Sequence, residues 1–182
     1  MLSPTAILSW LESHVLDMRK SRRKTLAAIV QGAMAVRGLG VLALGRAMDT
    51  GTTAKHNIKR VNGFLGNESV ETVSVARAVF NTFAPTEGRV LALADWTDLP
   101  NGKMLVFALP RSGRALPFLS VCVPKDPDEG MLKEAEAKAL TLLSQVVGSR
   151  TDITLVAVAD RGFGNKRWLG AVHGHGWNYV QR

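Results

Sequence analysis

Two short apolar segments, each followed by an aspartate, constrain the fold of this chain more than any other feature. Residues 90–94 read Val-Leu-Ala-Leu-Ala before Asp95, and residues 153–159 read Ile-Thr-Leu-Val-Ala-Val-Ala before Asp160. Runs of this length and composition are typical of strands that are buried on both faces of a sheet. If the two strands are parallel neighbours, their carboxyl ends meet at one edge of the sheet, and both aspartates lie there.

Two carboxylates that are held close together repel each other unless they share a proton or a cation. Mg²⁺, or Mn²⁺ in its place, suits such a site, because Mg²⁺ takes one or two carboxylates and retains several waters. Either aspartate alone has a simpler explanation, since an Asp after a strand often caps a turn or a helix. The pairing of Asp95 with Asp160, and the residues that follow each of them, favours the metal site.

At these residues the chain resembles the DDE transposases of the insertion-sequence-four type. Residues 94–97, Ala-Asp-Trp-Thr, look like the first catalytic Asp motif of that family, and residues 159–163, Ala-Asp-Arg-Gly-Phe, look like the second. Residues 61–67 resemble the family's "RFL-N" helix upstream of the core, and residues 176–182 resemble the strand after the second Asp. The resemblance implies an RNase H-like catalytic core.

The same resemblance implies a DNA transposase that cleaves and joins strands at transposon ends by two-metal phosphodiester chemistry. Asp95 and Asp160 would be its catalytic metal ligands, double-stranded DNA its partner, and a homodimer is compatible with it. Arg161 would contact a DNA phosphate, although a surface salt bridge explains this residue equally well. The family's third acid, a Glu on a later helix, has no counterpart before Arg182, so we expect the sequence as given to be truncated and inactive by itself.

Two alternatives remain open from the sequence. One is a catalytically silent DNA-binding fragment that inhibits transposition, and the other is an RNase H-like nuclease unrelated to transposition. The remaining polar candidates are expected to serve structural roles: Asp98 in the turn before Pro100, and Asp152 at the far end of its strand from Asp160. The His173-Gly-His175 pair lacks further ligands at zinc spacing and is expected to lie in a solvated loop.

The charge of the chain is concentrated in its N-terminal half. The formal net charge is +8, and residues 1–82 carry 11 Lys and Arg against 5 Asp and Glu, whereas residues 83–182 carry 12 against 10. Such a basic excess favours an anionic partner, most often a nucleic acid. Within that half, residues 54–65 predict a helix whose polar face carries Lys55, Lys59 and Arg60, and we expect these three side chains to contact DNA.

The change of hydrophobic period near residues 84–88 predicts two domains. Residues 1–84 should form an all-helical DNA-binding domain, with helices over 3–18, 26–37, 41–48, 54–65 and 70–83. Residues 85–182 should form the truncated RNase H-like catalytic domain, a mixed sheet with helices in an α/β class. Its expected elements are strands over 89–95, 103–109 and 114–123, a helix over 128–147, a strand over 153–159, a helix over 164–173 and a strand over 176–181.

The single cysteine, Cys122, excludes an internal disulfide and is interpreted as a small core residue of its strand. A cytoplasmic protein is therefore expected. The longest apolar run near the N-terminus, residues 38–45, lies between Arg37 and Arg46 and is far too short to span a bilayer. No association with a membrane is expected.

Overall fold

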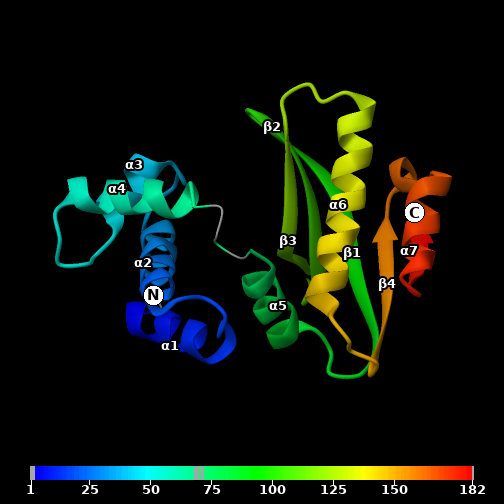
Figure 1. Ribbon diagram of the computed structural model, residues 1–182, viewed down its shortest axis with the longest axis horizontal. Coiled ribbons are helices and arrows are strands. Elements are labelled where there is room, and N and C mark those ends of the chain that lie inside the picture. Colours follow the sequence, from blue (N-terminus) through cyan, green and yellow to red (C-terminus); the bar gives the residue numbers. More distant parts are fainter. Residues whose placement is uncertain (1–2, 68–69, 71, 182) are drawn as a thin grey trace. The chain divides into compact units, whose positions relative to one another are not determined.

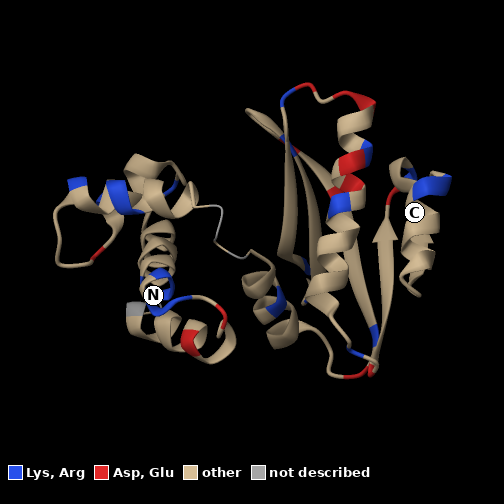
Figure 2. Ribbon diagram, in the orientation of Figure 1, with Lys and Arg blue, Asp and Glu red and all other residues tan. Residues whose placement is uncertain are grey.

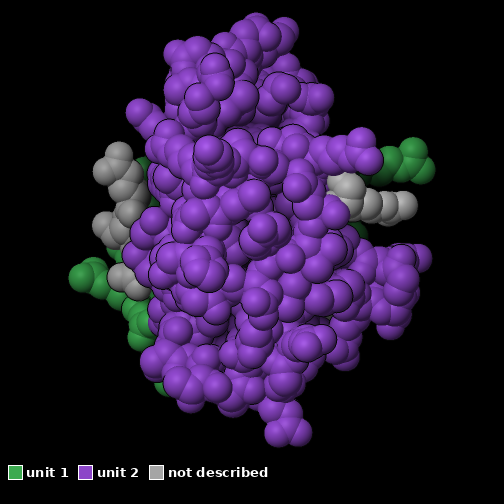
Figure 3. Space-filling model, turned by 90° about the vertical axis from the view of Figure 1, so that its right-hand side faces the viewer, with its two compact units in different colours: residues 1–75 green, residues 76–182 purple. Residues whose placement is uncertain are grey.

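The computed structural model describes residues 3–67, residue 70 and residues 72–181 (Figure 1). The chain divides into two compact units, residues 1–75 and 76–182, which Figure 3 colours separately. The division falls inside the helix α5 (Thr72–Phe83), earlier than the change of sequence pattern at residues 84–88. The second half of α5 belongs to the sheet unit, because Phe80 packs against Phe118 and Arg77 donates to the carbonyl of Gln145.

The first unit is helical, as the sequence predicts. It contains α1 (Pro4–His14), α2 (Lys20–Ala35), α3 (Val41–Ala47) and α4 (Ala54–Leu65). The core that joins α2, α3 and α4 consists of apolar side chains: Ala28, Ile29, Leu44, Met48 and Val61. α1 ends before the predicted position, but Val15 and Met18 are still buried in the turn that follows it.

The second unit is a five-stranded mixed sheet with helices, which confirms the α/β class. A meander of β1 (Gly88–Leu99), β2 (Gly102–Arg111) and β3 (Arg114–Pro124) is followed by α6 (Glu129–Val147), β4 (Ile153–Ala159), a 3₁₀ turn (Arg161–Phe163), α7 (Lys166–Gly174) and β5 (Asn178–Gln181). The strand order is β3-β2-β1-β4-β5. β1 is antiparallel to β2 and parallel to β4, so the predicted pairing of the two Asp-bearing strands is confirmed.

The two faces of the sheet differ in what covers them. α6 lies over one face of the sheet (Figure 1). Val90, Ala92 and Ala94 of β1 are buried and share one face. Ala94 pairs with Phe107 of β2, on which Trp168 of α7 stacks. On the other face Leu91 remains 40% exposed. Cys122 is also exposed, so the prediction of a core cysteine is wrong. It alternates along edge strand β3 with the buried Val121 and therefore points away from the core.

The end of the sheet opposite the aspartate pair is fixed by Arg150. Its guanidinium pairs with Asp152 and donates to the carbonyl oxygens of Pro85 and Thr86, 3.2 and 2.5 Å away. The amide of Gly88 in turn donates to the carbonyl of Asp152 at 3.0 Å. The hydrogen-bonded guanidinium lowers the pKa of the Asp152 carboxyl. Asp152 is thus a structural residue at the far end of β4, as the sequence predicts.

None of the helices in the described part of the chain combines the length and the apolar character that a membrane crossing requires.

Candidate functional site

The register of β1 on β4 brings the two sequence-predicted aspartates to the same level of the sheet. The parallel ladder runs from Gly88 opposite Ile153 to Ala94 opposite Ala159. Asp95 and Asp160 are the next residue on each strand, so each stands one step beyond the last paired residues. Both side chains are exposed. Since side chains alternate along a strand, Asp95 points to the face opposite the buried Ala94.

The two aspartates differ in their backbone setting. Asp160 ends its strand as predicted, and its Oδ1 accepts a hydrogen bond of 2.9 Å from the amide of Gly162, which caps the 3₁₀ turn. Asp95 was expected to end its strand as well, but β1 continues to Leu99 because Asp95 still pairs with Val106 of β2. Asp95 therefore lies inside a hydrogen-bonded strand, and its backbone is held more firmly than that of a loop residue.

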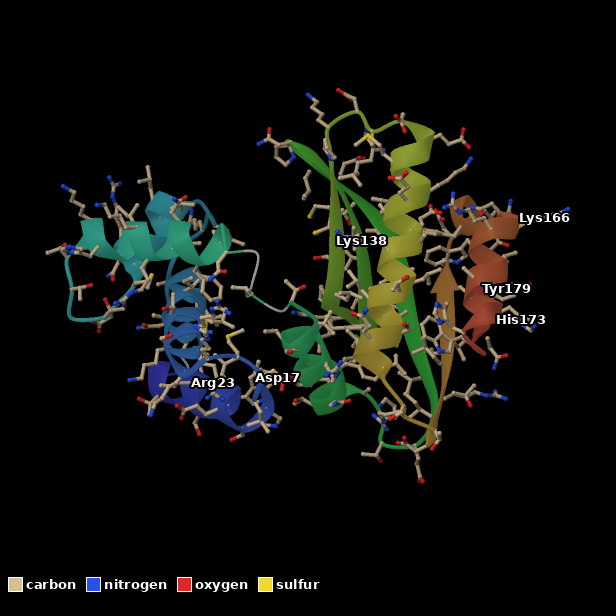
Figure 4. All side chains as sticks on the ribbon, viewed as in Figure 1. Asp17, Arg23, Lys138, Lys166, His173 and Tyr179 are labelled. Atoms are coloured by element: carbon tan, nitrogen blue, oxygen red, sulfur yellow. The ribbon has the colours of Figure 1, made fainter. Side chains whose placement is uncertain are left out.

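Basic side chains gather beside Asp160. Arg161 follows it directly and is exposed, and its carbonyl accepts hydrogen bonds from the Gly164 amide and the Gln181 side chain. The first turn of α7 adds Lys166 and Arg167, and Figures 2 and 4 show basic groups where this helix begins. The sequence analysis missed these two residues, because only the return of the chain through the 3₁₀ turn brings α7 next to the end of β4.

This edge of the sheet is an open surface. The cavity beneath Asp160, lined by Phe163 and Trp168 among others, measures only about 10 Å³, which is barely enough for one water molecule. A small substrate cannot be enclosed there. An extended polymer that lies across the edge can reach both aspartates and the basic side chains.

Asp95 and Asp160 are the carboxylates that could hold a divalent cation at this edge of the sheet. Two carboxylates completed by waters are an acceptable ligand set for Mg²⁺. Among the residues that the structure describes, no group of three or more acidic, His or Cys side chains is placed to hold a metal. Asp98 does not supply a third ligand, because it forms a salt bridge of 3.4 Å with Lys103 and alternates with Asp95 to the other face of β1.

A third acidic residue near the site, Glu136 of α6, was not singled out from the sequence. It is half-buried, and its carboxylate accepts a hydrogen bond from Trp96, the residue next to Asp95. Burial raises the pKa of Glu136, and this outweighs the lowering by the Trp96 hydrogen bond and by the positive charges of Arg167 and Lys133. Glu136 of α6 thus interacts with both β1 and α7, through Trp96 and Arg167.

Replacing Glu136 by Gln is expected to raise the melting temperature of the sheet unit at pH 7. Because the folded-state pKa of Glu136 lies above its ordinary value of 4.5, folding favours the protonated group, and stability falls as the pH rises through that window. Gln keeps an oxygen for the Trp96 indole and carries no charge. The gain should therefore shrink as the pH falls below 4.5, as melts at pH 7 and pH 4 would show. Glu134→Gln, at an exposed position of the same helix, is the control, and an equal gain in both variants would contradict this role of Glu136.

The helical unit holds the other predicted site residues. Lys55, Lys59 and Arg60 all lie on α4 and are exposed. The turn before α4 is ordered by the buried Asn57, whose Oδ1 accepts hydrogen bonds from Thr50 and Thr52 at 2.6 and 2.8 Å. Its Nδ2 donates to the carbonyl of Met48 at 3.0 Å. These bonds fix where α4 begins and hence the direction of its basic face.

α4 is also held close to α3 at Gly45. A Cβ atom built on Gly45 would lie 2.6 Å from the Cα of Ile58 and 2.7 Å from its backbone nitrogen. The helix backbones can approach this closely only because Gly45 has no side chain. Together the two contacts make α4 a rigid, exposed and basic helix on a small scaffold.

No model of a known protein family matches the chain, and no curated protein matches it. Two surfaces have chemistry that bears on function: a basic helix in the first unit, and an exposed pair of aspartates with basic neighbours in the second.

Proposed function

We propose that this protein acts on double-stranded DNA in the manner of a DDE transposase. The helical unit binds the duplex, and Asp95 and Asp160 hold a Mg²⁺ or Mn²⁺ ion for phosphodiester chemistry. The observation that carries the proposal is the parallel pairing of β1 and β4, whose register ends at Ala94 opposite Ala159, one residue before Asp95 and Asp160. When bound, the ion would stabilise the negative charge that develops on the phosphate during strand cleavage or joining.

Three features of the chain support this function. The order of a three-strand meander, a helix, a strand, a helix and a strand is the one expected of an RNase H-like core. The aspartate pair lies on an open edge, where a polymer can reach it. Arg161 and the first turn of α7 provide positive charge beside Asp160, suited to binding the phosphates that flank a reacting bond.

A second candidate is a DNA-binding protein without catalytic activity. The observation in its favour is that the described residues offer ligands for one ion, whereas two-metal chemistry needs a second ion fixed against the same phosphate. The two candidates share DNA binding and differ in metal binding. Metal binding by Asp95 and Asp160 therefore discriminates between them.

DNA binding by the full chain is expected to weaken steeply as salt rises, and the Lys59→Ala, Arg60→Ala pair should lower the slope of log K against log salt by roughly 1 to 2. Each exposed cation that contacts a phosphate releases counterions, so its removal reduces the salt dependence. The measurement is fluorescence anisotropy with a labelled duplex at several salt concentrations. The control pair is Lys125→Ala, Lys138→Ala, which removes the same charge from exposed positions of the sheet unit (Lys138, Figure 4). An equal change in both pairs would show that α4 does not make the contacts.

A further inference from the structure

An open cavity of about 180 Å³ lies between α2 and α4 of the helical unit, next to the basic face of α4. Its lining is rich in cationic, hydroxyl and amide side chains: Ser21, Arg22, Thr25, Arg60 and Asn67, with Gly63 and Phe64 completing the wall. None of these lining residues is acidic. The cavity has room for a phosphate group and several waters, at about 30 Å³ for each water.

The donors of this cavity suit an oxyanion. Arg60 contributes a planar guanidinium, which can bind two phosphate oxygens at once. Ser21 contributes a hydroxyl, whereas the Thr25 hydroxyl already donates to the Ser21 carbonyl at 3.1 Å. Ser21 and Arg22 lie in the first turn of α2, a helix of 16 residues whose N-cap residue, Arg19, makes no side-chain cap hydrogen bond. The positive end of the helix dipole therefore adds to the attraction for an anion.

A second, larger cavity of the same unit is a poorer candidate. It measures about 310 Å³ and is lined by Lys24 and Arg60, but also by Asp49. The Asp49 carboxylate would repel a phosphate, and it offers Arg60 an acidic neighbour on that side. An anion that binds Arg60 is therefore favoured in the smaller cavity, whose described lining residues include no acidic side chain.

We propose that the cavity between α2 and α4 binds one backbone phosphate of duplex DNA, with Arg60 and Ser21 as the hydrogen-bond donors. This inference rests on the proposed function and adds a contact from α2 to it. A DNA backbone is favoured over a free phosphate because Arg60, which lines the cavity, belongs to the same exposed helix as Lys55 and Lys59. Phosphate contacts of this kind fix the position of a protein on the duplex and carry no sequence information.

Gly63 allows a direct test, because a Cβ atom built there meets nothing within 4 Å. Gly63→Glu places a negative charge at the cavity, and its Cβ atom has free space. Gly38→Glu is the matched control, since Gly38 also has nothing within 4 Å and adds the same charge to the same unit outside the cavity. Melting temperatures of both variants verify that they are folded.

With the full chain and a duplex of mixed sequence, Gly63→Glu is expected to weaken binding by about tenfold relative to Gly38→Glu. Arg60→Lys should also weaken DNA binding but leave the slope of log K against log salt unchanged. Lys keeps the positive charge but cannot form the bidentate hydrogen bonds of a guanidinium. If the two Glu variants bound DNA with equal affinity, the cavity would not be a phosphate site. The proposed function would be unaffected by that result.

A parallel titration with inorganic phosphate, followed by the NMR signal of the Gly63 amide, separates the two sources of phosphate. If inorganic phosphate binds weakly and duplex DNA displaces it, the result supports a backbone phosphate as the occupant of the cavity. Binding of inorganic phosphate by a protein that does not bind DNA would overturn the DNA backbone as the occupant and the proposed function with it. If the protein bound neither inorganic phosphate nor DNA, the cavity would not be an anion site of any kind.

Discussion

Replacing Gly45 by Ala is expected to lower the free energy of unfolding of the helical unit by about 1–3 kcal/mol, the usual cost of forcing extra atoms into a packed interface. The added methyl group would lie 2.6 Å from the Cα of Ile58, a distance that no real contact of this kind tolerates. The obstacle is backbone and not a flexible side-chain end, so α3 and α4 must move apart. This outcome opposes helix propensity, which favours Ala over Gly by about 1 kcal/mol.

The measurement is denaturant unfolding followed by NMR of the four tryptophan indoles. Trp10 lies in the first unit, whereas Trp96, Trp168 and Trp177 lie in the second, so each unit has its own signal. Gly63→Ala is the matched control, because its methyl group meets nothing within 4 Å and should stabilise α4 by about 1 kcal/mol. If Gly45→Ala left the Trp10 transition unchanged, the close crossing of α3 and α4 would be disproved.

The same variant connects the packing of the helical unit to its proposed function. α4 carries Lys55, Lys59 and Arg60, and its position depends on the crossing at Gly45 and on the Asn57 hydrogen bonds. Gly45→Ala should therefore weaken DNA binding and leave the three tryptophan signals of the sheet unit in place. A loss of DNA binding that spares the sheet unit would place the duplex contacts in the first unit.

The sequence contained enough information for the order of the elements and for the parallel pairing of β1 with β4. Strong period-2 and period-3.6 patterns, separated by turns such as Pro100-Asn101-Gly102, mark the elements locally. The helical crossover α6 then requires β1 and β4 to run in the same direction. These signals are local or topological, and no knowledge of side-chain packing is needed to read them.

The features that could not be predicted from the sequence depend on long-range packing. The continuation of β1 beyond Asp95 comes from pairing with β2, and the exposure of Cys122 comes from the face toward which an edge strand turns it. The role of Glu136 depends on α6 lying over Trp96 and close to Arg167. No spacing in the sequence indicates such a contact, because its residues lie on three separate elements.

Mg²⁺ or Mn²⁺ is expected to raise the melting temperature of the sheet unit, and Asp95→Asn and Asp160→Asn are each expected to abolish the increase. An ion that binds only the folded state stabilises it by about 2.7 kcal/mol when its free concentration is 100 times the dissociation constant. The proposed site has only two charged ligands, Asp95 and Asp160, so removal of one charge should eliminate most of the affinity. The increase is measured from melts with and without metal, followed by the tryptophan signals of this unit.

The Asn variants are conservative enough to separate metal binding from folding. At residue 160 the amide oxygen of Asn can still accept the hydrogen bond from Gly162, so the cap of the 3₁₀ turn should survive. Asp98→Asn is the matched control, because Asp98 is exposed and lies three residues from Asp95. Its salt bridge with Lys103 is exposed and worth at most about 1 kcal/mol. A metal effect that persists in Asp95→Asn or Asp160→Asn would place the ion elsewhere. The absence of a metal effect in the unmodified protein, together with intact DNA binding, would favour the catalytically silent DNA-binding protein over the enzyme.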